Sequence, residues 1–169
     1  PDTTCWVNDF RNSYNEPYMK LYFSHPSYND YPVVGVSWEQ ANAFCAWRTN
    51  YLLAGLRGAA RYLQRYRLPT EVEWEFAARG KEDNAYPWKG KDTKSDEGCY
   101  YANYKPGRGN YTKDGNLIST KVGSYSPNSN GLYDMAGNVS EWTESPYNNS
   151  TYQFSSTLNP YLSNQAYRE

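Results

Sequence analysis

The sequence predicts an α+β fold that is loop-rich and has little regular secondary structure. Two segments, which begin near residues 38 and 71, each follow a capping motif and carry apolar residues at helical spacing. Beyond residue 80, Gly, Pro, Asn, Asp and Ser interrupt the chain every few residues, as in "YYANYKPGRGN" and "GSYSPNSNG". We therefore expect two helices and a few short strands joined by long loops.

Three short segments are candidate strands. Residues 1–31 show no periodicity and are expected to form loops, but the run "YPVVGVSW" follows, and its Val33, Val34 and Val36 suit a short buried strand. Later in the chain, "STKVGSY" and "NVSEWTES" are further candidates, the second with residues alternating between two faces.

The first helix is expected to run from about residue 38 to residue 52. Ser37 is a favourable N-cap, and Gln40 completes an S-x-x-Q capping box. Apolar residues follow at helical spacing, among them Cys45. We expect Cys45 to be a buried thiol or the partner of a cysteine outside this segment.

Residues 53–67, "LAGLRGAARYLQRYR", are basic and contain two glycines. This segment either extends the first helix or forms a loop with a helical turn. Its charges are those of an ordinary solvated face. The interleaving of four arginines with Tyr and Leu would also suit a docking surface.

The second helix has the clearest local signal, in "RLPTEVEWEFAARG". Pro69 excludes helix before it, Thr70 is an N-cap, and Glu73 completes a T-x-x-E capping box. Acidic residues in the first turns suit the helix dipole, and Gly80 is a natural residue to end the helix. We expect about nine helical residues. Their apolar positions are Val72, Trp74, Phe76 and Ala77.

Size and composition bound the function. The 169 residues fit one domain, and a net charge of −1 gives no electrostatic argument for nucleic acid or an anionic membrane. Aromatic residues make up 18% of the chain, so we expect a core of large rings whose polar tips need hydrogen bonds. The chain starts without Met or an apolar leader, and we expect it to be a segment of a longer protein.

The residues give little support for catalysis. Cys5, Cys45 and Cys99 are far apart and form no C-x-x-C motif, so zinc or thioredoxin-like chemistry has no basis. Whether Cys5 pairs with Cys99 is not decided by the sequence. His25 is the one histidine, and its place before a proline in a turn favours a structural role. No phosphate-binding glycine motif occurs, and nothing selects a glycosidase-like carboxylate pair.

The oxygen-rich stretch "GLYDMAGNVSEW" suggests a bound cation. Calcium takes six to eight oxygens from carboxylates, amides and backbone carbonyls, and short glycine-containing turns supply them efficiently. Asp134 and Glu141 flank the turn, which can direct the carbonyls of Gly137 and Val139 to the same point. The segments "YYANY" and "KDGN" offer a second set of oxygens. Surface loops with Asx-turns are the alternative for both.

Five separated motifs carry a family resemblance. In chain order they are "YPVVGVSWEQANAFCAW", "YRLPTEVEWEFAARG", "YPWKG", "YYANY" and "GLYDMAGNVSEWTES", over about residues 31–145. This order resembles the formylglycine-generating enzyme (sulfatase-modifying factor) superfamily. The resemblance implies a loop-rich fold around a C-type-lectin-like core, of which residues 1–169 would form a single partial domain.

The resemblance also implies calcium at two loops. In the enzymes, one loop binds calcium through a side chain before the "GN", two carbonyls and a Glu, and a second loop holds another ion. Carried over, the first set is Asp134, Gly137 (carbonyl), Val139 (carbonyl) and Glu141, and the second is Asn103, Tyr104 (carbonyl), Asp114 and Asn116 (carbonyl).

The enzymes' chemistry is not expected to carry over. They bind copper through two cysteines close in sequence, whereas Cys45 and Cys99 are 54 residues apart. Cys45 instead resembles a structural cysteine of the enzymes, whose partner would lie beyond residue 169. We therefore expect no catalytic residue and a pseudoenzyme. The alternative is a formylglycine-generating oxidase whose catalytic cysteines lie outside this segment.

A narrower resemblance concerns the first 38 residues, the insertion at residues 50–66 and "STLNPY". These resemble the gliding-motility lipoprotein K group (GldK, PorK) of Bacteroidota, and GldJ shares much of the pattern. The group implies a structural subunit of the type IX secretion system, periplasmic and held at the outer membrane by a lipid anchor upstream. Its partners would be the N protein (GldN, PorN) and other subunits of a large ring, with the insertion as an assembly surface. A lectin-like ligand-binding module is a third class, for which no sugar site can be named.

Overall fold

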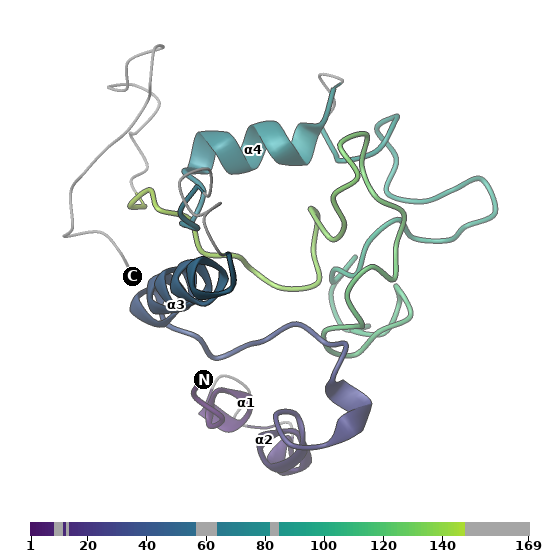
Figure 1. The fold of residues 1–169 in the computed structure, drawn as a ribbon. Coiled ribbons are helices and arrows are strands. Elements are labelled where there is room, and N and C mark those ends of the chain that lie inside the picture. The colour runs from purple at the N-terminus through teal and green to yellow at the C-terminus, as the bar shows by residue number, and fades with distance from the viewer. Residues whose placement is uncertain (9–11, 13, 57–63, 82–84, 148–169) are drawn as a thin grey trace. The chain divides into compact units, whose positions relative to one another are not determined.

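A computed structural model describes residues 1–8, 12, 14–56, 64–81 and 85–147. Their helical elements are α1 (Cys5–Asn8), α2 (Glu16–Leu21), the 3-10 turn η1 (Pro26–Tyr28), α3 (Trp38–Gly55) and α4 (Glu71–Arg79), as Figure 1 shows. The chain divides into two compact units. The first unit is Pro1–Gly35 with Glu75–Ser140, and the second unit is Val36–Trp74 with Glu141–Glu169. Within the described ranges, no helix has both the length and the hydropathy needed to cross a membrane.

The loop-rich character is confirmed, but the expected strands are absent from the described residues. Among the described residues, the one β-bridge is an isolated antiparallel pair, Lys94 and Tyr100. Val33 is 63% exposed, so the valine run is not a buried strand. The segments "STKVGSY" and "NVSEWTES" are also irregular. A few alternating apolar residues are insufficient without a neighbouring strand to pair their backbone groups.

The expectation of loops at residues 1–31 was wrong for much of that stretch, which forms α1, α2 and η1. Helix α1 packs against α2, side by side in Figure 1. The ring of Trp6 lies 5.3 Å from that of Tyr18 and 4.9 Å from that of Tyr22, centre to centre. Helices this short are unstable alone. Ring packing between them, which leaves no periodicity in the sequence, therefore stabilises them.

Tyr22 lies at the centre of this aromatic core, with 4% of its surface exposed. Its hydroxyl donates to the carbonyl of Pro32 at 2.7 Å and lies 2.8 Å from the hydroxyl of Ser119. Burial raises the pKa of this hydroxyl. The prediction of a core of rings with hydrogen-bonded tips is confirmed here, because a buried phenol needs such partners.

Helix α3 begins as predicted. The Ser37 hydroxyl accepts from the Gln40 amide, and the Ser37 amide donates to the Gln40 side chain at 3.1 Å. The helix continues to Gly55, so it extends a short way into the basic segment. Residues 57–63 lie outside the described part of the chain. Beyond them, the Tyr66 amide donates to the buried Thr49 hydroxyl at 2.9 Å, which ties the returning segment to α3.

One face of α3 carries exposed rings. Phe44, Trp47 and Tyr51 form an aromatic row in which neighbouring ring centres are 5.5 and 5.4 Å apart. Their exposed fractions are 55%, 54% and 66%. Cys45 is half-buried rather than buried. The helical spacing was therefore predicted correctly, but the rings do not all face a core.

Helix α4 spans the nine residues Glu71–Arg79, in agreement with the prediction. The Thr70 hydroxyl accepts from the Glu73 amide at 3.3 Å, while the Glu73 carboxylate accepts from the Thr70 amide at 2.8 Å. At the other end, the Asn128 side chain donates to the carbonyls of Ala77 and Ala78 at 2.7 and 3.0 Å. Among the predicted apolar positions, Phe76 is 74% exposed and does not join a core.

Tryptophan side chains hold the irregular segment after residue 140 in the second unit. The Trp38 indole donates to the Thr143 carbonyl at 3.0 Å, and the Trp142 indole donates to the Val36 carbonyl at 2.7 Å. These bonds satisfy backbone carbonyls that a sheet would otherwise pair. They explain how this segment is fixed without being a strand.

Candidate calcium-binding loops

The Asp134 loop, residues 131–140, holds one carboxylate in an unusual state. Asp134 has φ +55°, in the left-handed region. One of its oxygens, Oδ2, accepts from the Gly123 amide at 2.7 Å. The other, Oδ1, is buried and has no hydrogen-bond partner among the described residues. A buried carboxylate oxygen without a partner is costly, and an ion is one of the groups that would satisfy it. This oxygen fits the predicted calcium ligand.

Gly137 is required by the shape of the same loop. Its φ is +84°, and a Cβ there would overlap the carbonyl of Asn103. Its own carbonyl, a predicted ligand, accepts from the Val139 amide at 2.9 Å in a tight turn. Since a carbonyl has two lone pairs, this bond leaves one for a cation.

Asn138 joins the Asp134 loop to the Asp114 loop, residues 103–116. Its amide donates to the Asn103 carbonyl at 2.7 Å. Its side chain accepts from the Thr120 amide at 2.8 Å and donates to the Thr120 carbonyl at 3.2 Å. The side chain of Asn103 also donates to it at 3.3 Å. Sequence reasoning missed this role, although the "GN" dipeptide signals a turn in which Asn tolerates a positive φ.

The second predicted set is brought together in part. Asp114 accepts from the Tyr104 amide at 2.7 Å and from the Asn116 amide at 3.4 Å. The buried Asn103 uses its side-chain amide to donate to the Ile118 carbonyl at 2.9 Å, so its side-chain oxygen is not occupied by that bond. Both oxygens of Asp114 already face amide groups, so this set fits a cation less directly than Asp134 does.

Glu141, the remaining predicted ligand, belongs to the second unit, whereas Asp134, Gly137 and Val139 belong to the first. There its carboxylate accepts from the Trp74 indole at 2.8 Å. The complete four-ligand set therefore stays a prediction from the resemblance.

The surroundings of both loops are polar rather than rich in acids. No group of three or more His, Cys, Asp or Glu side chains with metal-binding geometry occurs within the ranges that the structure covers. A cation here would depend on amide and carbonyl oxygens, as calcium sites commonly do.

Burial and the Asp114 carboxylate raise the pKa of the Tyr125 hydroxyl, which accepts from Asn116 at 2.9 Å.

None of the three cysteines forms a disulfide. Cys5 and Cys99 lie in the same unit, so the pairing that the sequence left open does not occur in this structure. His25 accepts from the Ser27 amide through Nδ1 at 3.2 Å and so caps η1. Its observed role is the structural one that was expected.

Comparison with known proteins places these loops in a family context. The family described as "sulfatase-modifying factor enzyme 1-like domain" matches residues 8–167. The inactive C-alpha-formylglycine-generating enzyme 2 of Bos taurus is 39% identical over 120 residues, which are 70% of this chain and 34% of that protein. The formylglycine-generating enzyme of Streptomyces coelicolor is 38% identical over 136 residues, 78% of this chain and 38% of that protein.

Solved structures give the same picture. PvdO from Pseudomonas aeruginosa matches with a TM-score of 0.53 and 28% identity, over 70% of this chain and 40% of that one. Treponema denticola variable protein 1 matches with a TM-score of 0.50 and 30% identity, over 72% of this chain and 51% of that one. The chain spans about a third of the length of the two formylglycine-generating enzyme relatives, 34% and 38%.

Proposed function

Because the chain belongs to the sulfatase-modifying factor enzyme 1-like family, we propose that it is a non-catalytic assembly subunit with calcium-stabilised loops. Membership alone does not decide between activity and assembly, since the relatives carry the names of both an enzyme and an inactive form. The observation that carries the proposal is the exposed aromatic row on α3.

The aromatic row has the composition of a protein-binding surface. Phe44, Trp47 and Tyr51 each have more than half of their surface exposed. Trp, Tyr and Arg are enriched among residues that dominate binding energy at protein interfaces. Arg48 follows Trp47 on the helix, and its guanidinium lies 5.3 Å from the centre of the Tyr66 ring. An assembly subunit would use such a surface to bind a partner.

The row also runs into the insertion at residues 50–66, the assembly surface suggested by the sequence. Tyr51 is in both, and the bond from the Tyr66 amide to Thr49 fixes the far end of the insertion to α3. A partner that contacts the row would therefore also meet the described ends of the insertion, residues 50–56 and 64–66. Within the described residues, Arg65 is an exposed charge of this surface.

Calcium has a structural role in this proposal. Asp134 would bind it through the buried Oδ1, with the carbonyls of Gly137 and Val139 as further candidate ligands. The bound ion would supply positive charge to a buried carboxylate and fix a loop that has no strand to support it. No chemistry on a substrate is assigned to it.

The narrower proposal is a subunit of the type IX secretion and gliding machinery. It rests on the resemblance of the first 38 residues and of the insertion to the K group of gliding-motility lipoproteins. In that role the full-length protein would be periplasmic, anchored in the outer membrane by a lipid, and assembled with the N protein into a large ring. The exposed aromatic row suits such a ring, which needs extensive contacts between subunits.

The alternative is a formylglycine-generating oxidase. It is favoured by the 38% identity to the Streptomyces coelicolor enzyme and would need two neighbouring cysteines elsewhere in the full-length protein. Cys5, Cys45 and Cys99 do not provide such a pair, since they are 40 and 54 residues apart.

One experiment separates these functions. The native full-length protein is purified from its cell envelope, its partners are identified by mass spectrometry, and the particle size is measured on the same sample. A large particle that contains the N protein is the expected result. A monomer that converts the cysteine of a sulfatase peptide to an aldehyde would replace the proposal with the oxidase.

A further inference from the structure

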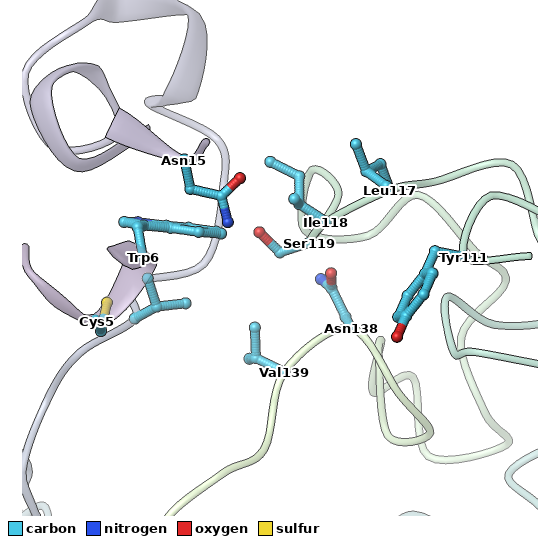
Figure 2. Close-up of a pocket in the computed structure, with 10 residues that line it drawn as sticks. Cys5, Trp6, Asn15, Tyr111, Leu117, Ile118, Ser119, Asn138 and Val139 are labelled. Carbon is cyan, nitrogen blue, oxygen red and sulfur yellow. The ribbon is translucent and has the colours of Figure 1, made fainter. Parts of the chain in front are cut away.

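The first unit contains a cavity of about 560 Å³ (Figure 2). This volume lies within the range of small-molecule pockets, which are mostly apolar with a few polar groups. Val139, of the Asp134 loop, is among the residues that line the cavity, and Figure 2 shows its side chain there. Neither the proposed calcium ligation nor the aromatic row requires such a cavity.

Much of the cavity lining is apolar. Trp6 of α1, which is 6% exposed, contributes to it together with the half-buried Val34, Ile118 and Val139. Leu117 lies at the rim and is 62% exposed. These side chains come from segments far apart in the sequence, and Figure 2 shows them around one space. Such a lining favours a ligand with a hydrocarbon body, because contact removes apolar surface from water on both sides.

The polar residues that line the cavity include Asn15 and Tyr111. Asn15 holds the N-cap position of α2 but makes no capping bond with its side chain, so its amide is available to a ligand. Elsewhere in the lining, Tyr111 lies beneath Lys105, whose ammonium is 3.6 Å from the ring centre. A hydrogen bond from Lys105, together with its charge, lowers the pKa of the Tyr111 hydroxyl, so a cation contacts this lining residue.

We propose that this cavity binds a small amphipathic carboxylate. The hydrocarbon body contacts Trp6, Val34 and Ile118, and the carboxylate lies at the side of Tyr111 and Lys105. The side-chain amide of Asn15 forms a hydrogen bond, as donor or acceptor, with a polar group at the opposite end of the ligand. No covalent step is involved.

The first test is calorimetric titration of the full-length protein with 4-phenylbutyrate and with 4-phenylbutan-1-ol, its neutral counterpart. We expect saturable binding of one acid molecule per chain and about tenfold weaker binding of the alcohol, the size of one charge-assisted hydrogen bond. Lys105→Gln should lower the affinity for the acid to that for the alcohol and leave the affinity for the alcohol unchanged. The proposal is overturned if neither compound shows saturable binding up to about 10 mM, a concentration at which a ligand of millimolar affinity would saturate the site.

Two further variants locate the site. Ile118→Trp should fill the cavity and abolish binding of both compounds. Leu117→Glu is less disruptive to folding, because this rim residue is 62% exposed. It should weaken binding of the acid at least about tenfold by charge repulsion and change the affinity for the alcohol little. Phe76→Ala, which removes an exposed ring of α4 in the same unit, is the matched control and should leave both affinities unchanged. Loss of binding in the control, or unchanged acid binding in Leu117→Glu, would overturn the site.

A hydroxyl group added at the end of the ligand opposite the carboxylate tests the role of Asn15. A 4-hydroxyl on the phenyl ring of the acid should improve binding about fivefold, as a neutral hydrogen bond does. Asn15→Ala should remove this preference without changing the affinity for unsubstituted 4-phenylbutyrate. An equal preference in both proteins would overturn the role of Asn15.

Discussion

In the first unit the rings of Trp6 and Tyr22 are packed together and nearly inaccessible, with 6% and 4% of their surfaces exposed, whereas in the second unit the aromatic row lines an exposed face of α3. The ring–ring distances are alike, 4.9 Å for Trp6 and Tyr22 and 5.4 Å for Trp47 and Tyr51. The difference lies in the surroundings: the Tyr22 hydroxyl has two hydrogen-bond partners, and the Tyr22 ring also contacts the rings of Phe23, Tyr28 and Tyr31. Contact between rings is therefore not by itself the sign of a core.

The comparison predicts its largest effect in the first unit. Tyr22→Ala removes a buried ring from the centre of the core, and such truncations cost about 3–5 kcal/mol. Phe76→Ala, in the same unit but 74% exposed, is the control and should change stability by no more than about 0.5 kcal/mol. Urea denaturation measures both. Similar losses for the two variants would contradict the division into buried and exposed rings.

The second effect concerns the Asp134 loop, which lacks the rings of the core and would depend on calcium. With free calcium a hundredfold above the dissociation constant, binding adds about 2.7 kcal/mol of stability. Chelator should therefore lower the Tm of the wild type, while Asp134→Ala should have a lower Tm and little further response. Asp96→Asn, at an exposed aspartate of the same unit, should behave like the wild type. Equal chelator sensitivity of the Asp134 variant and the wild type would reject the assignment.

A smaller effect is expected from a surface ion pair of the second unit. Arg67 donates to both oxygens of Glu73 at 2.7 and 2.6 Å and, with the Thr70 amide, lowers the pKa of Glu73 from 4.5 to about 2. The pair therefore contributes stability that is fully present above pH 4.5 and is lost as the pH falls toward 2. Since the side chains are 58% and 48% exposed, solvent screening keeps this contribution below about 1 kcal/mol.

The pH dependence can be isolated with Glu73→Gln. The difference in unfolding free energy between this variant and the wild type should shrink as the pH is lowered from 5 to 2.5, a window that spans much of the shift. Arg67→Gln should show the same trend. A difference that stays constant over this range would mean that the ion pair contributes no stability.

The smallest effect on stability is expected for the aromatic row. Trp47→Ala removes an exposed ring and introduces the best helix former, so stability should change by less than about 0.5 kcal/mol. The affinity for the N protein, the proposed assembly partner, should fall at least about tenfold if Trp47 is a dominant contact. Partner affinity is measured with purified proteins, next to the thermal melt of the variant. Unchanged affinity in this variant and in Arg65→Glu would reject the surface.

The two long helices could be predicted because their signals are local. Both capping boxes lie within four residues and form the bonds that the motifs imply. The short helices α1 and α2 could not, because they depend on contacts between rings from different segments. Periodicity likewise reveals which residues share a helix face, but not whether anything covers it, as the exposed Phe76 illustrates.

The candidate site was predictable to a similar degree. Asp134 and Gly137 were selected by a turn-rich pattern and by resemblance, and the structure adds a buried carboxylate oxygen and a left-handed glycine at these positions. The role of Asn138 was missed because its partners, Thr120 and Asn103, are 18 and 35 positions away. Long-range hydrogen bonds of this kind leave no mark in a local pattern.

The double attachment of Asn138 has a thermodynamic consequence. Asn138 belongs to one loop, and both its backbone amide and its side chain are bonded to Asn103 of the other, so neither loop can become disordered without loosening its neighbour. If both loops bind cations, the first ion to bind would bear most of the entropic cost of ordering, and the second would bind to a loop already ordered. Occupancy would then rise with positive cooperativity, and the coupling would be reciprocal between the two sites.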